Sequence, residues 1–171
     1  MAGRDILQLG NPLLLEKSSR VDDFSAFEKQ SLIQDLSDTL AAFRGATGYG
    51  RGIAAPQIGA LKRAIFIRMQ PMGFCAALLN PEIVWLSNQK IELWDDCFSF
   101  PDLLVSVERA VQVKVTYTDE QGAQQTVAAE GALAELLQHE IDHLDGILAV
   151  ERAISPKAFS TRSEWERQDK R

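Results

Sequence analysis

Apolar residues recur at three- and four-residue intervals in two parts of the chain, and this spacing predicts two amphipathic helices. The first helix is expected over residues 23–44, where Asp23 or Ser25 can cap its start and Gly45 ends it. The second helix is expected over residues 131–145, with Gly146 as its C-terminal stop. Each helix therefore presents one apolar face to a core.

Short runs of β-type residues fill the middle of the chain, separated by prolines, glycines and polar residues. We expect strands over residues 64–67, 76–79, 83–86 and 91–94. The clearest hairpin alternates apolar and polar residues over 111–117, turns at 119–122 and returns over 125–128. Because these strands lead directly into the second helix, the sequence predicts an α+β fold with mostly antiparallel β-sheets packed around a central helix.

The length of 171 residues is typical of one domain, so we expect residues 1–171 to form a single domain. A further helix is expected from Pro156 towards Lys170, but its apolar face holds little beyond Phe159 and Trp165. We therefore expect residues 156–171 to form a peripheral helix whose end frays.

The charge balance excludes one class of partner. The chain has 18 Lys and Arg against 24 Asp and Glu, and the net charge of −6 has the wrong sign for binding nucleic acid by counterion release. Docking on the ribosome would need a local basic patch. The longest apolar run, residues 74–79, is too short for a membrane span or a signal peptide. Two cysteines are too few for a disulfide scaffold, which favours a cytoplasmic protein that binds no membrane.

The two histidines of the chain, His139 and His143, lie four residues apart on the second predicted helix. Four residues make about one helical turn, so both imidazoles project from one face and can bind one metal ion. Glu140 lies beside the first histidine, where it can reach a water on the metal and act as general base. The alternative is a surface helix with a chance H-E-x-x-H, which would have to hold every histidine of the chain by accident.

A catalytic metal site usually has a third protein ligand, and three sources are conceivable. The histidine that follows some H-E-x-x-H motifs is absent, because Ala149 occupies its position. A later carboxylate, Glu164 or Glu166, would make the chain resemble a small metalloprotease. The thiolate of Cys97, which lies in a polar context, would be a strong ligand for a transition metal. We favour Cys97 over these and over Cys75, which lies in an apolar run and is expected to be buried.

A glycine-rich loop precedes residues 53–57, and metal binding does not explain its glycines. It has no G-K-[ST], so it is no phosphate loop, and it lacks the strand-and-helix setting of a dinucleotide fingerprint. Close approach of the backbone to an extended ligand is the better use of these glycines. The sequence thus predicts no cofactor beyond the metal.

Three motifs of the chain resemble those of the peptide deformylase family and occur in the family's order. The family's G-x-G-x-A-A-x-Q loop appears at residues 50–57, its E-G-C-x-S strand end at residues 95–99, and its H-E-x-D-H helix at residues 139–143. The resemblance extends from about residue 6 to residue 156. It implies the peptide deformylase fold and hydrolysis of the N-formyl group from the starting methionine of nascent polypeptides, with release of formate.

The resemblance also implies a metal and the residues that use it. Cys97, His139 and His143 would hold one divalent ion, Fe²⁺ in the cell, with Zn²⁺, Ni²⁺ or Co²⁺ as substitutes. Glu140 would help to deprotonate the attacking water and then pass the proton to the departing amine.

Further residues of the three motifs would contact the substrate. The side chain of Gln57 and the backbone N–H of Phe98 would stabilise the oxyanion. An N-formyl-methionyl peptide would pair with the glycine loop as an added strand, with its methionine in an apolar pocket. The expected substrate-binding residues are Gly50, Arg51, Gly52, Asp96 and Leu136, although Leu136 is equally well explained as part of the core.

The chain departs from the family pattern at four places near the expected cleft, one of them a pair of neighbouring residues. Asp95-Asp96 replaces Glu-Gly, Phe98 replaces a leucine, Arg51 replaces an aliphatic residue, and Leu104 replaces a basic residue. We hypothesise that Arg51 and Asp96 face each other across the cleft as an opposite-charge pair; the alternative is two independent surface charges. These changes leave the substrate open.

Two other functions remain open at this point. One is the small metalloprotease with a late glutamate ligand. The other is a catalytically weak relative that keeps the metal for stability and binds peptides, for which the altered cleft residues are the support.

Overall fold

The computed structural model describes residues 3–22, 25–70 and 73–169, and its strands form two antiparallel sheets. The five-stranded sheet has the order β1-β2-β3-β6-β7 and the three-stranded sheet the order β4-β5-β8. The strands of the first sheet are β1 (Gly52–Ala54), β2 (Ala64–Met69), β3 (Phe74–Leu86), β6 (Gln112–Thr118) and β7 (Gln124–Glu130). Those of the second are β4 (Lys90–Asp96), β5 (Leu103–Ala110) and β8 (Phe159–Thr161).

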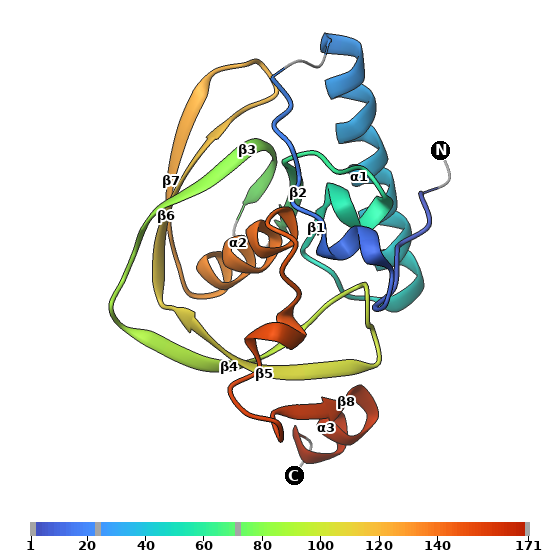
Figure 1. Ribbon diagram of the computed structural model, residues 1–171, viewed down its shortest axis with the longest axis vertical. Helices are drawn as coiled ribbons and strands as arrows, with labels where there is room; N and C mark the ends of the chain where they lie inside the picture. The colour runs from blue at the N-terminus through green and yellow to red at the C-terminus, as the bar shows by residue number, and fades with distance from the viewer. Residues whose placement is uncertain (1–2, 23–24, 71–72, 170–171) are drawn as a thin grey trace.

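The helix α2 (Gly131–Leu144) lies at the centre of the molecule, between the two sheets (Figure 1). Its apolar stripe packs on the first sheet in one buried cluster that includes Ile65, Leu78, Val115, Leu137 and Ile141. From Leu133 onwards the helix is buried on nearly all sides, and its polar motif residues are buried with the rest. The predicted α+β fold around a central helix is confirmed.

The helix α1 (Ala26–Thr47) packs on the outside of β1 and β2, where it builds a second apolar cluster. Ser25 caps it as expected, and Glu28 completes a capping box. The predicted stop at Gly45 is wrong: the helix continues to Thr47, and Gly48 ends it with a left-handed φ of 81°. Asp23, the other cap candidate, lies outside the described residues.

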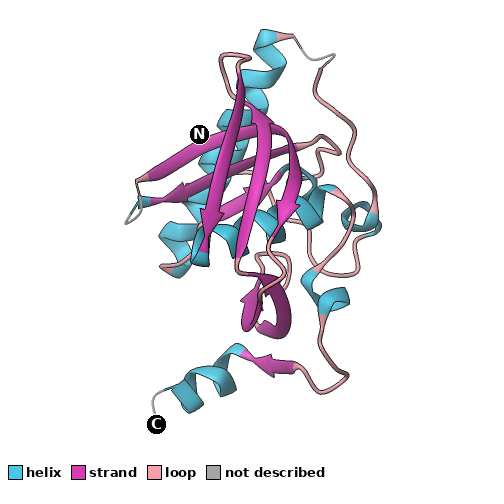
Figure 2. Ribbon diagram, turned by 90° about the vertical axis from the view of Figure 1, so that its left-hand side faces the viewer, coloured by secondary structure: helices cyan, strands magenta, loops and turns pink. Residues whose placement is uncertain are grey.

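The strands extend the predicted ones and join two of them. The runs 76–79 and 83–86 belong to one strand, β3, which passes Pro81 with a shift of register against β6. The hairpin β6–β7 has the expected strands and turn, and its register pairs Val115 with Val127. Three of the strands, which Figure 2 colours magenta, were not predicted: β1, β5 and β8.

Cys75 corrects a prediction, because it is exposed rather than buried. Along β3 the side chains alternate between the two faces. Phe74 and Ala76 pack against the core, so Cys75 between them points outwards, opposite Arg68 of β2. The prediction failed because residues on both faces of this part of β3 are apolar, so the sequence shows no alternation.

The C-terminal segment lies at the edge of the second sheet, below β5 in Figure 1. It comprises a 3-10 turn, η4 (Ala149–Arg152), then β8 and a short helix, α3 (Arg162–Asp169). The peripheral helix is thus present but starts at Arg162 instead of Pro156, because residues 159–161 pair with β5. Two further 3-10 turns are η1 (Pro12–Leu15) and η2 (Ala55–Ile58). None of the helices in the described ranges has the length and apolar character that a membrane crossing requires.

Candidate metal centre and active site

Three buried side chains from distant parts of the sequence converge beside α2. The Nε2 atoms of His139 and His143 lie 3.2 Å apart, and the Sγ atom of Cys97 lies 3.2 Å from His143 Nε2. One nitrogen or sulfur atom of each residue lies within 4.8 Å of the others. The helix supplies the histidines from consecutive turns, and β4 ends just before the cysteine. Cys97, the favoured third ligand of the sequence analysis, is therefore the residue that the fold brings to the histidines.

These three atoms fit a divalent transition metal. A thiolate with two imidazoles is a donor set typical of zinc or iron sites. Burial and the neighbouring His139 lower the pKa of His143, so that its ring nitrogen keeps a free lone pair at neutral pH. Glu164 and Glu166, the alternative ligands, are exposed on α3 and do not join this cluster.

Asp95 fixes the orientation of His139, a role that the sequence analysis did not assign. Its carboxylate accepts a hydrogen bond from His139 Nδ1 at 2.9 Å, which directs Nε2 towards Cys97 and His143. Burial opposes a charge on Asp95, but His139 and Arg109 outweigh it and hold the pKa of this carboxyl below its usual range. The carboxylate is thus ionised and holds the imidazole ring in one orientation.

Arg109 links Asp95 to a second buried carboxylate, that of Asp142. The sequence did not point to this residue either. The guanidinium is 4% exposed and donates to Asp95 at 2.8 Å and to Asp142. Asp142 also accepts a hydrogen bond from a second arginine, Arg152, at 2.7 Å. Two buried carboxylates and a buried guanidinium are therefore mutually paired, which buried charges require. Nothing in the sequence singled out Arg109, because β5 has no clear pattern.

Glu140 is buried beside the Cys97–His139–His143 cluster. Its carboxylate lacks the hydrogen-bond partners that a structural carboxylate would have. No described residue hydrogen-bonds its Oε2 atom. Burial raises the pKa of Glu140 to about 7. A carboxyl of this kind can take up and return a proton near neutral pH.

Gln57 and Phe98 flank the cluster on the other side. The side-chain oxygen of Gln57 accepts from the backbone N–H of Ala54, which turns its Nε2 atom towards Cys97 Sγ at 3.4 Å and Ser99 Oγ at 3.3 Å. The ring of Phe98 stacks on Phe43 with centroids 3.8 Å apart. The stacked ring fixes the backbone that follows the cysteine.

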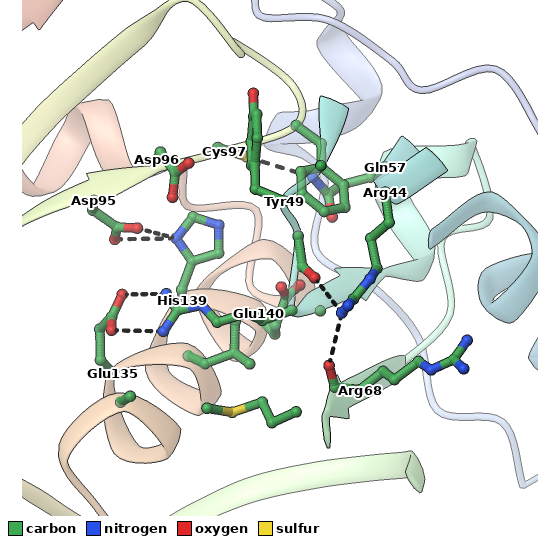
Figure 3. Close-up of a pocket in the computed structure, with 18 of the residues that line it drawn as sticks. Arg44, Tyr49, Gln57, Arg68, Asp95, Asp96, Cys97, Glu135, His139 and Glu140 are labelled. Carbon is green, nitrogen blue, oxygen red and sulfur yellow. Dashed lines mark hydrogen bonds and ion pairs between the residues drawn. The ribbon is translucent and has the colours of Figure 1, made fainter. Parts of the chain in front are cut away.

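These residues open into a cavity of about 730 Å³ (Figure 3). The side chains of Cys97, His139 and Glu140 face it, and Gly50 and Gly52 form part of its wall. All five predicted substrate-binding residues line it, and Leu136 also belongs to the core cluster, so that both explanations of this residue apply. The size is typical of a site for a small molecule or a short peptide.

The proposed pair between Arg51 and Asp96 is wrong. Arg51 instead makes two parallel hydrogen bonds to Glu135, and Asp96 pairs with Arg162 at 2.7 Å. Arg162 also lies over the ring of Tyr49, 4.3 Å from its centroid. Each charge therefore has its own partner, at a sequence distance that no local pattern could reveal.

Comparison with known proteins gives the family. The sequence model described as Polypeptide deformylase matches residues 3–159. The peptide deformylase of Heliobacterium modesticaldum is 42% identical over 154 residues, covering 89% of this chain and 95% of that protein. That of Brachyspira hyodysenteriae is 39% identical over 146 residues, covering 82% and 73%.

The chain belongs to the peptide deformylase family. Peptide deformylases are metal-dependent hydrolases that remove the N-formyl group from nascent polypeptides. Solved structures agree with this assignment. The Legionella pneumophila peptide deformylase has a TM-score of 0.82 at 34% identity, covering 99% of each chain. The Synechococcus elongatus enzyme, solved in complex with actinonin, has a TM-score of 0.82 at 32% identity, covering 91% of this chain and 81% of that one.

Gly52 leaves room for the carboxylate of Glu140, and this gives a first prediction. A Cβ atom at Gly52 would lie 2.6 Å from Glu140 Oε1, so Gly52→Ala must displace the carboxylate. A shift of this size is expected to lower kcat in a deformylase assay about a hundredfold while the metal content stays unchanged. The control is Gly45→Ala in α1, where nothing lies within 4 Å of the new Cβ. Full activity of Gly52→Ala would contradict the assigned position of Glu140.

Proposed function

We propose that this chain hydrolyses the formyl amide at the start of N-formyl-methionyl polypeptides, releasing formate and leaving a free amine. The observation that carries the proposal is the buried carboxylate of Glu140, which has no hydrogen-bond partner at Oε2 among the described residues and lies next to the Cys97–His139–His143 cluster. A buried carboxylate in that position has a chemical use but no structural one.

Cys97 Sγ, His139 Nε2 and His143 Nε2 would hold one divalent ion, with Fe²⁺ as the ion in the cell and Zn²⁺, Ni²⁺ or Co²⁺ as substitutes. The ion, when bound, acts as a Lewis acid and lowers the pKa of water. Asp95 supports this role because its carboxylate accepts the Nδ1 hydrogen of His139, which leaves Nε2 as the ring nitrogen directed at the cluster.

Glu140 would move the proton in both halves of the reaction. Its carboxylate accepts a proton from the water that attacks the formyl carbon. When the C–N bond breaks, the protonated carboxyl returns that proton to the amine nitrogen, so that the products are the free amine and formic acid, which loses its remaining acidic proton to solvent as formate. A pKa raised to about 7 suits both the uptake and the return.

The charge that develops on the formyl oxygen needs donors near the cluster. Gln57 Nε2 is aimed at this place by the bond that its oxygen accepts from Ala54. The backbone N–H of Phe98, next to Cys97 in the chain, is the second donor. Both are fixed before substrate binds, which is the condition for effective stabilisation of an oxyanion.

The substrate backbone would lie along β1, an edge strand of the five-stranded sheet. An extended peptide can hydrogen-bond to such an edge as an added strand. Side chains at Gly50 and Gly52 would fill the space, because their Cβ atoms would lie 2.7 Å from the Phe98 ring and 2.6 Å from Glu140. Leu136 gives the first side chain of the peptide an apolar contact. We place the reaction in the cytoplasm, on chains emerging from the ribosome.

The test incubates the metal-loaded protein with formyl-Met-Ala-Ser and, separately, with an unformylated protein substrate, and identifies the products by mass spectrometry. Loss of the formyl group alone, with every peptide bond intact, is the expected result. Cleavage within the unformylated substrate would favour the metalloprotease. Binding of the formyl peptide without any product would favour the catalytically weak peptide-binding protein.

A further inference from the structure

An ion pair between Arg51 and Glu135 forms part of one wall of the cavity, beside the Cys97–His139–His143 cluster. Arg51, which precedes β1, donates from Nη1 and Nη2 to the two carboxylate oxygens of Glu135 on α2, at 3.2 and 2.9 Å. In Figure 3 both contacts are drawn as dashed lines from Glu135, close to His139. The Arg51 side chain is 37% exposed and that of Glu135 is 16% exposed, so the pair is half-buried. The arrangement is rigid, because both planar groups are held in register.

The pair lies where the first side chain of a bound peptide must end. Glu135 precedes His139 by four residues and therefore lies about 6 Å along the same face of α2. The first residue of the substrate is bonded directly to the formyl group, which must lie next to Glu140 and the Cys97–His139–His143 cluster. A side chain of the length of methionine, running along α2 over Leu136, thus reaches the level of Arg51 and Glu135.

The guanidinium retains hydrogen-bonding capacity at this position. It has five N–H donors, of which two serve Glu135, and no other described side chain accepts from it. The neighbouring carboxylates are engaged elsewhere, Asp96 by Arg162 and Asp95 by His139 and Arg109. An apolar side chain that covers these donors leaves them without water, whereas an acceptor atom at its end satisfies one of them.

We propose that Arg51 and Glu135 adapt the side-chain pocket to N-formyl peptides whose first side chain ends in a hydrogen-bond acceptor, with N-formyl-methionine sulfoxide as the substrate that fits. The proposal rests on the proposed function and adds a substrate class to it. The sulfoxide oxygen accepts from the free N–H donors of Arg51, while the rest of the side chain contacts Leu136. Glu135 holds the guanidinium in place and compensates its charge.

The test compares kcat/KM for formyl-Met-Ala-Ser with kcat/KM for the same peptide carrying methionine sulfoxide. In the double variant Arg51→Leu/Glu135→Leu, the sulfoxide-to-methionine ratio is expected to fall about tenfold from the wild-type ratio, because the donors are lost. In Glu135→Gln the ratio is expected to stay within about threefold, since Arg51 is retained. The control is Lys90→Leu/Glu108→Leu, an exposed ion pair at the far end of β4, which should leave the ratio unchanged.

The outcomes separate this inference from the proposed function. A merely structural role of the pair would lower both rate constants together, so an unchanged ratio in Arg51→Leu/Glu135→Leu overturns the inference while formate release upholds the function. A wild-type ratio tenfold above that of the variant supports both. Release of formate from neither peptide by the metal-loaded wild type overturns the function, and the inference with it.

Discussion

Glu140→Gln is expected to lower kcat for a formyl-methionyl peptide by about a thousandfold or more while the protein keeps its metal. The amide has nearly the shape of the carboxylate, but it cannot accept the proton of the attacking water. It also cannot return a proton to the amine when the C–N bond breaks. Both chemical steps therefore lose their proton carrier at once. Because Glu140 Oε2 has no hydrogen-bond partner among the described residues, the substitution breaks no structural contact at that atom.

The measurement combines steady-state kinetics with metal analysis of the same preparations. Glu92→Gln, an exposed glutamate on β4, is the matched control and should keep wild-type activity. KM is expected to change little, since the carboxylate acts on the water and the leaving group. Wild-type turnover by a metal-loaded Glu140→Gln protein would show that another group carries the proton.

Cys97→Ala is expected to remove the metal together with the activity. In the proposed centre the cysteine supplies one of three ligand atoms, and its thiolate has the greatest preference for a transition metal among them. Loss of a supporting residue alone typically costs ten- to a hundredfold in metal affinity, so loss of this ligand should cost at least about a hundredfold. Equilibrium dialysis against a competing chelator measures the change.

The chain offers a matched control in its other cysteine. Cys75→Ala changes an exposed thiol on β3 and should alter neither metal affinity nor turnover. Retention of the metal by Cys97→Ala, combined with its loss in Glu164→Ala or Glu166→Ala, would contradict the proposed centre and support the metalloprotease ligand set. The exposed positions of both glutamates on α3 make that result unexpected.

The residues that could be predicted from the sequence share local geometry. His139, Glu140 and His143 are placed relative to one another by the helix alone, so a four-residue spacing was sufficient. Cys97 was chosen by its polar neighbours and its ligand chemistry, and the fold brings it 3.2 Å from His143. The hairpin β6–β7 followed from strict alternation because one face of these strands is buried.

The contacts that could not be predicted join distant parts of the chain. Arg51 and Glu135 are 84 residues apart, and Asp96 and Arg162 are 66 apart. A sequence shows that such charges exist but not which of them share a wall of the cavity, so the pairing of Arg51 with Asp96 was wrong. For the same reason Asp95 was noted only as a departure from the family pattern.

Errors in the fold had local causes. Four glycines lie close together at 45, 48, 50 and 52, and only the backbone conformation shows that α1 passes Gly45 and ends at Gly48. Cys75 looked buried because its neighbours are apolar, although strand alternation places it on the outer face. The strand β1 has three residues, too few for a periodic pattern, yet its edge forms the cleft.

The most direct test of the central claim follows formate and free amine from formyl-Met-Ala-Ser over time with protein purified without oxygen and loaded with Fe²⁺. We expect one formate for each amine, loss of both after removal of the metal by a chelator, and recovery when Fe²⁺ or Ni²⁺ is restored. A protein that binds one metal ion per chain at Cys97, His139 and His143 and releases no formate would contradict it.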